Sequence, residues 1–191
     1  PYVYCNVPKY TYNITTAASE FVKATFSSVP LTTIGFTVAI CYNTGNAIRQ
    51  AIAAQLANDI NMIGTIIAPP GKFHAYPLNV DWDLYIPAMH SNELPCFVTG
   101  WQADYPDVHN FAFSYAHSNG TFAQAQRYSN STIDGLIDQA IYLPDGPLRA
   151  VIYSSVELMF YQDVPTVPLF VPVERIYMRS WVQGWYYNPL Y

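Results

Sequence analysis

The stretch Ile34–Tyr42 (IGFTVAICY) restricts the possible folds more than any other, because it is apolar and β-branched without polar alternation. Such a run is typical of a strand that is covered on both faces, as in an α/β sheet. After the turn NTGN, apolar residues recur at helical spacing at Ile48, Ile52, Leu56, Ile60 and Ile63. This pattern predicts a helix over about 46–63. We expect Gly64 to end it and Thr65–Ala68 to form the next strand, which makes a βαβ unit.

Strands and helices continue to alternate along the chain, with no internal repeat. Asn13, Asp81 and Asn130 stand where helix N-caps are expected, and Ser131 to Asp134 has the form of a capping box. The stretch Gln102–Arg127 is aromatic and irregular, so we expect a long loop there. Together these features predict an α/β fold, with a mixed sheet flanked by helices. The further predicted elements are helices over about 14–26 and 81–91, a strand at 95–101, helices from Ser131 and Asp145, and a strand at 167–173.

Composition excludes some classes of protein. Charged residues make up only 11% of the chain and the formal net charge is -5, so there is no basic cluster for binding nucleic acid. The longest uncharged run contains proline and glycine, which argues against a membrane span. Cys5, Cys41 and Cys96 cannot all pair within one chain and match no zinc pattern. Cys41 and Cys96 lie in apolar runs, so buried free thiols are the favoured interpretation.

No catalytic motif is recognisable. The chain contains no G-x-S-x-G, P-loop or H-E-x-x-H sequence. Asp81 and Asp83 lie between His74 and His90, but their spacing follows no known metal-ligand pattern. We therefore expect a protein that is not an enzyme and that holds no metal and no cofactor.

The segment GWQADYPD at 100–107 is the strongest candidate for a functional site. It follows the predicted strand at 95–101, and ligands of α/β sheets bind outside the carboxyl ends of strands. Trp101 and Tyr105 offer flat aromatic faces, Asp104 a carboxylate and Asn110 an amide. No Lys or Arg lies between Lys72 and Arg127. The residues alone leave two interpretations open: a structural aromatic loop, or a site for a ligand with a free amino group or sugar hydroxyls.

At this point the chain resembles the family 5 extracellular solute-binding proteins, the peptide and oligosaccharide receptors of ABC importers. The resemblance rests on NTGNAIRQAIAAQLANDINMIG, WQADYPDVHNF, RYSNSTIDGLIDQA and VPTVPLFVPV, in this order along nearly the whole chain. It implies a periplasmic-binding-protein-like lobe of type II. Residues 1–191 would form the second lobe of a two-lobe protein, with 1–12 and 182–191 as interlobe connectors. In peptide-binding members the aspartate at the position of Asp104 receives the α-amino group of the ligand, and neighbours such as Trp101 line the cleft.

The resemblance also implies a function. We expect an extracellular, cell-surface or periplasmic component that captures dipeptides or oligopeptides by closure of two lobes and delivers them to ABC permease subunits. An oligosaccharide-binding member of the same family is the first alternative. A non-transporting surface glycoprotein domain is the second, and sequons at Asn13, Asn119 and Asn130 mildly favour export.

Overall fold

A computed structural model describes residues 10–171 and 176–186. The described residues form two compact units, one up to Gly100 and one from Trp101 onward, and each is treated by itself. Most of the predicted connectors, and Cys5 with them, lie outside the described residues. The described parts, 10–12 and 182–186, form no helix or strand.

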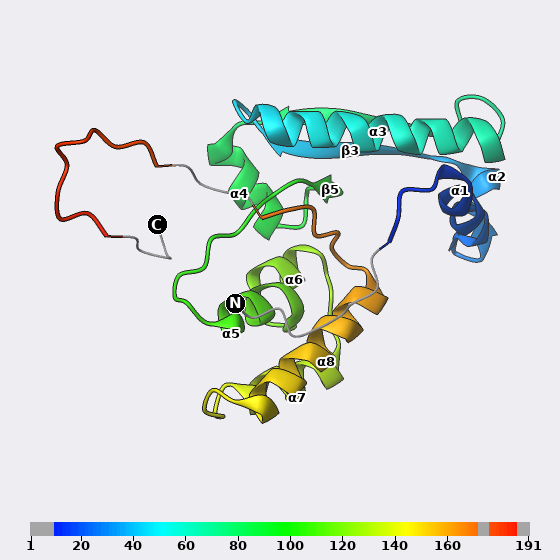
Figure 1. Cartoon of the computed structure of the whole chain (residues 1–191). Helices are drawn as coiled ribbons and strands as arrows, with labels where there is room; N and C mark the ends of the chain where they lie inside the picture. The colour runs from blue at the N-terminus through cyan, green and yellow to red at the C-terminus, as the bar shows by residue number, and fades with distance from the viewer. Residues whose placement is uncertain (1–9, 172–175, 187–191) are drawn as a thin grey trace. The chain divides into compact units, whose positions relative to one another are not determined.

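The first unit contains a βαβ core preceded by a short helix and a small two-stranded ribbon (Figure 1). Its elements are α1 (Ile14–Lys23), β1 (Thr25–Phe26), β2 (Val29–Pro30), α2 (Leu31–Ile34), β3 (Phe36–Asn43), α3 (Ala47–Ile67), β4 (Phe73–Val80), α4 (Trp82–His90) and β5 (Cys96–Phe97).

The main sheet has three strands in the order β4-β3-β5. Both pairings are parallel, with Phe36 opposite Phe73 and Ile40 opposite Cys96. Within the described residues, antiparallel pairing is confined to the β1–β2 ribbon. The predicted α/β class is thus confirmed. The mixed pairing that we expected is not seen in the three strands of this sheet.

Strand β3 is buried on both faces, which explains why its sequence lacks polar alternation. On one face Ile40 packs against Ala53 and Ala57 of α3. On the other face Cys41 packs with Tyr85 of α4, whose hydroxyl donates a hydrogen bond to the Val98 carbonyl at 2.9 Å. Cys41 is a buried free thiol, as expected, whereas Cys96 is a free thiol that is only half-buried.

Helix α3 is longer than the sequence predicts, because it continues past Gly64 to Ile67. The strand predicted at Thr65–Ala68 is therefore wrong, and β4 takes its place. Gly64 is a buried packing position and not a C-cap: a Cβ there would lie 2.7 Å from the Cβ of Phe73. Asn61 also fastens the helix to β4, since its side chain exchanges two hydrogen bonds with the backbone of Ala75.

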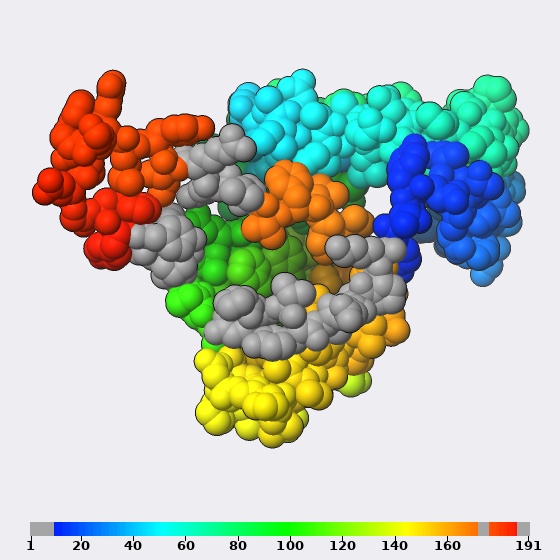
Figure 2. Space-filling model, viewed as in Figure 1, coloured from blue at the N-terminus to red at the C-terminus, as the bar shows by residue number. Residues whose placement is uncertain are grey.

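The other predictions for the first unit are largely confirmed. Asn13 caps α1 by accepting a hydrogen bond from the Thr16 N–H. Helix α4 begins after Asp81, but the Asp81 side chain makes no capping hydrogen bond, and β5 is only two residues long. The side of α3 away from the sheet forms part of the surface seen in cyan in Figure 2. Ile48 and Met62 of α3 are exposed.

The second unit is entirely helical in its described regular elements. The stretch Gln102–Arg127 is therefore not one long irregular loop, and the strand predicted at 167–173 is not formed over 167–171, while 172 and 173 lie outside the described residues. The elements are α5 (Val108–Ala116), α6 (Thr121–Ala125), α7 (Ser131–Ala140) and α8 (Pro147–Asp163).

Helices α7 and α8 pack against α5 around a small apolar core. Ile133 and Ile137 of α7 are fully buried against Ala116 and Val156. Asn130, one residue before the predicted capping box, caps α7. Asp134 instead accepts hydrogen bonds from the backbone and hydroxyl of Ser118, which fixes the α5–α6 turn. In the part of the chain that the structure describes, no helix combines the length and apolar character that crossing a membrane requires.

Candidate functional site

The predicted site residues lie in the segment that leads into α5 and in the first turn of that helix, within the second unit. Asp104 is exposed and Trp101 is half-buried. Tyr105 keeps 43% of its surface exposed. Asn110, in the first turn of α5, is buried, with 5% of its surface exposed. The segment therefore presents a carboxylate and an aromatic ring to solvent, and it buries the amide.

Three of the four predicted residues are joined by hydrogen bonds. The indole Nε1 of Trp101 donates to Oδ1 of Asn110 at 2.6 Å. Nδ2 of Asn110 in turn donates to Oδ2 of Asp104 at 3.2 Å. Tyr105 takes no part in this chain of contacts. The structure thus joins Trp101, Asn110 and Asp104 by hydrogen bonds. The sequence alone indicated only that these residues are close along the chain.

The Trp101 ring is held by aromatic packing. It meets Phe122 of α6 edge-on, with ring centroids 5.6 Å apart. Phe122 is buried and stacks on Tyr115 at 4.5 Å. Such offset and edge-on pairs contribute about 1 kcal/mol each beyond burial. Aromatic packing therefore holds the indole ring of Trp101, and with it the N–H that donates to Asn110, in position.

Asp107 lies three residues after Asp104 but has a different role. Its carboxylate caps α5 by accepting the His109 N–H at 2.7 Å, and it forms an ion pair with Nη2 of Arg149 at 2.7 Å. Burial raises the pKa of this carboxyl, but the hydrogen bonds from Arg149 and the His109 N–H outweigh burial and leave the pKa below its usual value. The charge of Asp107 is consequently neutralised within the protein.

Arg149 is the residue that sequence reasoning missed. It comes from the first turn of α8, 42 positions after Asp107, and it is only 7% exposed. Its guanidinium also contacts the Asp145 carboxylate at 2.8 Å and the Ala140 carbonyl at 3.2 Å, and it lies over the ring of Tyr153. No local pattern predicts this contact, because it depends on how α8 packs against α5.

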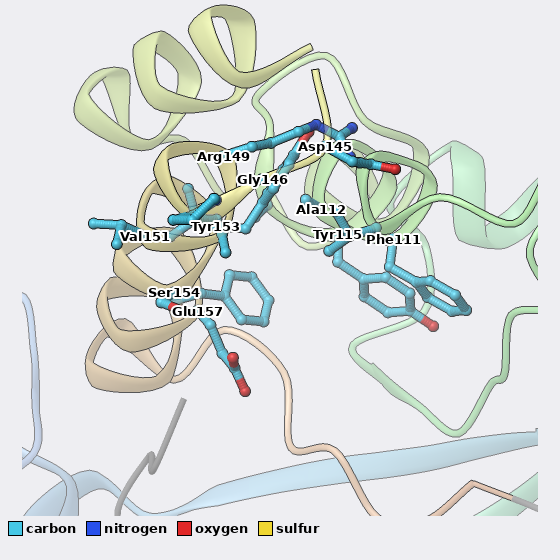
Figure 3. Close-up of a pocket in the computed structure, with 16 residues that line it drawn as sticks. Phe111, Ala112, Tyr115, Asp145, Gly146, Arg149, Val151, Tyr153, Ser154 and Glu157 are labelled. Carbon is cyan, nitrogen blue, oxygen red and sulfur yellow. The ribbon is translucent and has the colours of Figure 1, made fainter. Parts of the chain in front are cut away.

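A pocket of about 800 Å³ lies between α5 and α8 (Figure 3). Phe111 and Tyr115 of α5 line one side, and Ser154 and Glu157 of α8 line the other. Burial raises the pKa of Glu157 above its ordinary value. None of the four predicted site residues lines this pocket, so the two features are separate.

A metal site is not suggested by the geometry. Among residues 10–171 and 176–186, no three His, Cys, Asp or Glu side chains gather as a set of ligands. Instead, His109 is buried beside Tyr153, with Nδ1 3.2 Å from its hydroxyl, and Asp81 precedes α4. The expectation of no metal, no cofactor and no catalysis stays a prediction.

Comparison with solved structures identifies the class of fold. The chain has the fold of a periplasmic-binding-protein lobe. It aligns with a peptide-bound DppA from Helicobacter pylori over 86% of this chain and 30% of that one, with a TM-score of 0.68 and 21% identity. HbpA2 from Haemophilus parasuis aligns over 84% and 30%, with a TM-score of 0.69 and 20% identity.

Sequence comparison confirms the resemblance to the family 5 solute-binding proteins, although no family model matches the chain. Heme-binding protein A of Haemophilus influenzae is 26% identical over 151 residues, which cover 78% of this chain and 28% of that protein. The oligopeptide-binding protein OppA of Bacillus subtilis is 27% identical over 105 residues, which cover 55% and 18%. The chain thus spans less than a third of the length of these relatives.

Proposed function

We propose that this chain is the second lobe of an extracellular solute-binding component of an ABC importer, and that the protein captures dipeptides or oligopeptides. The observation that carries the proposal is Asp104, an exposed carboxylate joined to a buried amide and without an ion-pair partner among the described residues. Such a group is suited to receive the α-amino group of a peptide. Relatives that are named for binding oligopeptides support this ligand class.

Capture by closure follows from the proposed two-lobe arrangement. A ligand drives closure only through contacts that are better in the closed state than in the open one. This lobe would contribute the Asp104 carboxylate and the aromatic surface of Tyr105, and the other lobe would bury the rest of the peptide. The closed form would then be recognised by the permease subunits. The periplasmic relatives support a site of action outside the cytoplasmic membrane.

Calorimetry on the full-length protein that contains this chain tests the ligand class. Trialanine and maltotriose serve as probes for peptide and oligosaccharide. We expect the full-length protein to bind trialanine and not maltotriose, and the isolated chain to bind trialanine far more weakly because half of the cleft is missing. Binding of maltotriose alone favours the oligosaccharide alternative, and binding of neither refutes peptide capture and leaves the surface glycoprotein domain.

A further inference from the structure

The amide of Asn110 has a fixed orientation, because both of its polar atoms are used. Its oxygen accepts from the Trp101 indole at 2.6 Å and its nitrogen donates to Asp104 at 3.2 Å. An indole N–H can only donate, and an ionised carboxylate can only accept. The opposite orientation of the amide would therefore break both hydrogen bonds at once. Trp101 thus determines that a donor faces Asp104.

We infer that Asn110 is the positioning residue for Asp104, an inference that rests on the proposed function. The buried amide holds Oδ2 of the carboxylate and leaves Oδ1 without a hydrogen-bond partner among the described residues. That second oxygen is the one offered to the ammonium group of a ligand. Asn110 itself, at 5% exposure, acts through Asp104 and does not contact the ligand.

The place of Asn110 in the fold suits this role. It lies in the first turn of α5, and the start of that helix is fixed by the Asp107 cap and by Arg149. Asp104, by contrast, lies in a segment without regular structure, where an unsupported side chain would sample several rotamers. Restricting one such side chain before binding removes part of the entropy cost of ordering it when the ligand binds. Asn110 on a rigid helix therefore restricts the orientation of the Asp104 carboxylate, which lies in a loop, before the ligand binds.

The same geometry determines which ligands are accepted. The carboxylate of Asp107 is neutralised by Arg149, and both polar atoms of the Asn110 amide are hydrogen-bonded within the protein. The segment from Trp101 to the start of α5 therefore offers one negative charge, through Asp104. A free primary ammonium satisfies it, whereas an acetylated amine carries no charge and gains nothing from it. Selectivity for a free amino group should depend on Asn110.

The test measures affinities of the full-length protein for trialanine and for N-acetyl-trialanine. Asn110→Leu keeps the branched shape and the number of side-chain heavy atoms and removes both polar atoms. Trp101→Phe keeps an aromatic ring at this position beside Phe122 and removes the indole N–H. Asn119→Leu is the matched control, since Asn119 is an exposed asparagine in the α5–α6 turn and lies outside this set of hydrogen bonds.

We expect Asn110→Leu to weaken trialanine binding about tenfold and Trp101→Phe about threefold, because each removes a hydrogen bond that supports Asp104. Affinity for N-acetyl-trialanine should not change, and Asn119→Leu should match the wild type. The NMR signal of the Trp101 indole proton, protected from exchange in the wild type, should lose its protection in Asn110→Leu. This signal reports the contact without any ligand.

The outcomes separate this inference from the proposed function. If the wild type binds trialanine and both variants bind it equally well, the positioning role is wrong and peptide capture stands. An equal loss for both probes also refutes it, since that indicates general damage to the cleft. Trp101→Phe decides the matter if Asn110→Leu does not fold. A wild type that binds no peptide refutes the proposed function itself.

Discussion

Nη2 of Arg149 lies 2.7 Å from Oδ1 of Asp107, and this contact ties the start of α8 to the start of α5. The contact also gives Asp107 a different environment from Asp104, which lies three residues earlier. Asp107 is held as a helix cap and an ion-pair partner, while Asp104 remains exposed. The site proposed for a ligand amino group therefore depends on a contact that does not involve Asp104.

The Arg149–Asp107 pair should contribute measurably to stability. Replacing Arg149 by Met leaves Asp107 partly buried without its partner, and we expect a loss of about 2–4 kcal/mol in the free energy of unfolding. Asp145→Asn is the control, because Asp145 contacts the same guanidinium but its side chain is 73% exposed. It should cost about 0.5 kcal/mol. Equal losses in urea denaturation of the two variants would contradict a dominant role for Asp107.

Stability should fall on mild acidification because of His109. Burial lowers the pKa of its ring, and the nearby Asp107 carboxylate does not restore it. The unfolded chain then binds a proton at higher pH than the folded one, so stability declines as the pH falls below about 6.5. The slope can reach about 1.4 kcal/mol per pH unit. Denaturation midpoints of His109→Gln between pH 7 and pH 5 should show a smaller decline, and an unchanged decline would exclude His109 as its source.

Replacing Gly64 by a larger residue should destabilise the protein for a steric reason. Gly64→Ala places a methyl group 2.7 Å from the Cβ of Phe73, so we expect α3 and β4 to separate slightly, at a cost of about 1–3 kcal/mol. Gly135→Ala provides the matched change in α7, where a Cβ meets no atom within 4 Å. That variant should be more stable by about 0.5–1 kcal/mol, because alanine favours helix. Thermal unfolding of both variants shows whether the two changes in stability have opposite signs. Destabilisation by both variants would refute the packing argument.

Sequence patterns predicted the first unit better than the second. The run at β3 and the apolar stripe of α3 reflect burial on a regular period, so they are visible in the residues themselves. The predicted helix end at Gly64 was wrong, because a glycine at a helix end and a glycine packed under an aromatic residue look alike in sequence. The difference is the contact with Phe73, which is a tertiary one.

The aromatic-rich sequence of the second unit made the helix α5 hard to predict. The sequence of α5 (VHNFAFSYA) mixes apolar and polar residues, and its N-cap depends on Asp107, which a distant arginine supports. The candidate residues Trp101, Asp104 and Asn110 were nevertheless predicted together. Their spacing along the chain placed them near one another, but only the turn into α5 shows that the amide lies between the other two.

The most direct test of the whole account is the affinity of the full-length Asp104→Asn variant for trialanine and N-acetyl-trialanine, measured by calorimetry. Hydrogen bonds to a charged group contribute about 1.5–3 kcal/mol, so trialanine should bind about 10- to 100-fold more weakly than to the wild type. N-acetyl-trialanine should bind the two proteins equally. If the variant keeps the wild-type affinity for trialanine, Asp104 does not receive the amino group of the ligand and the proposed site is wrong.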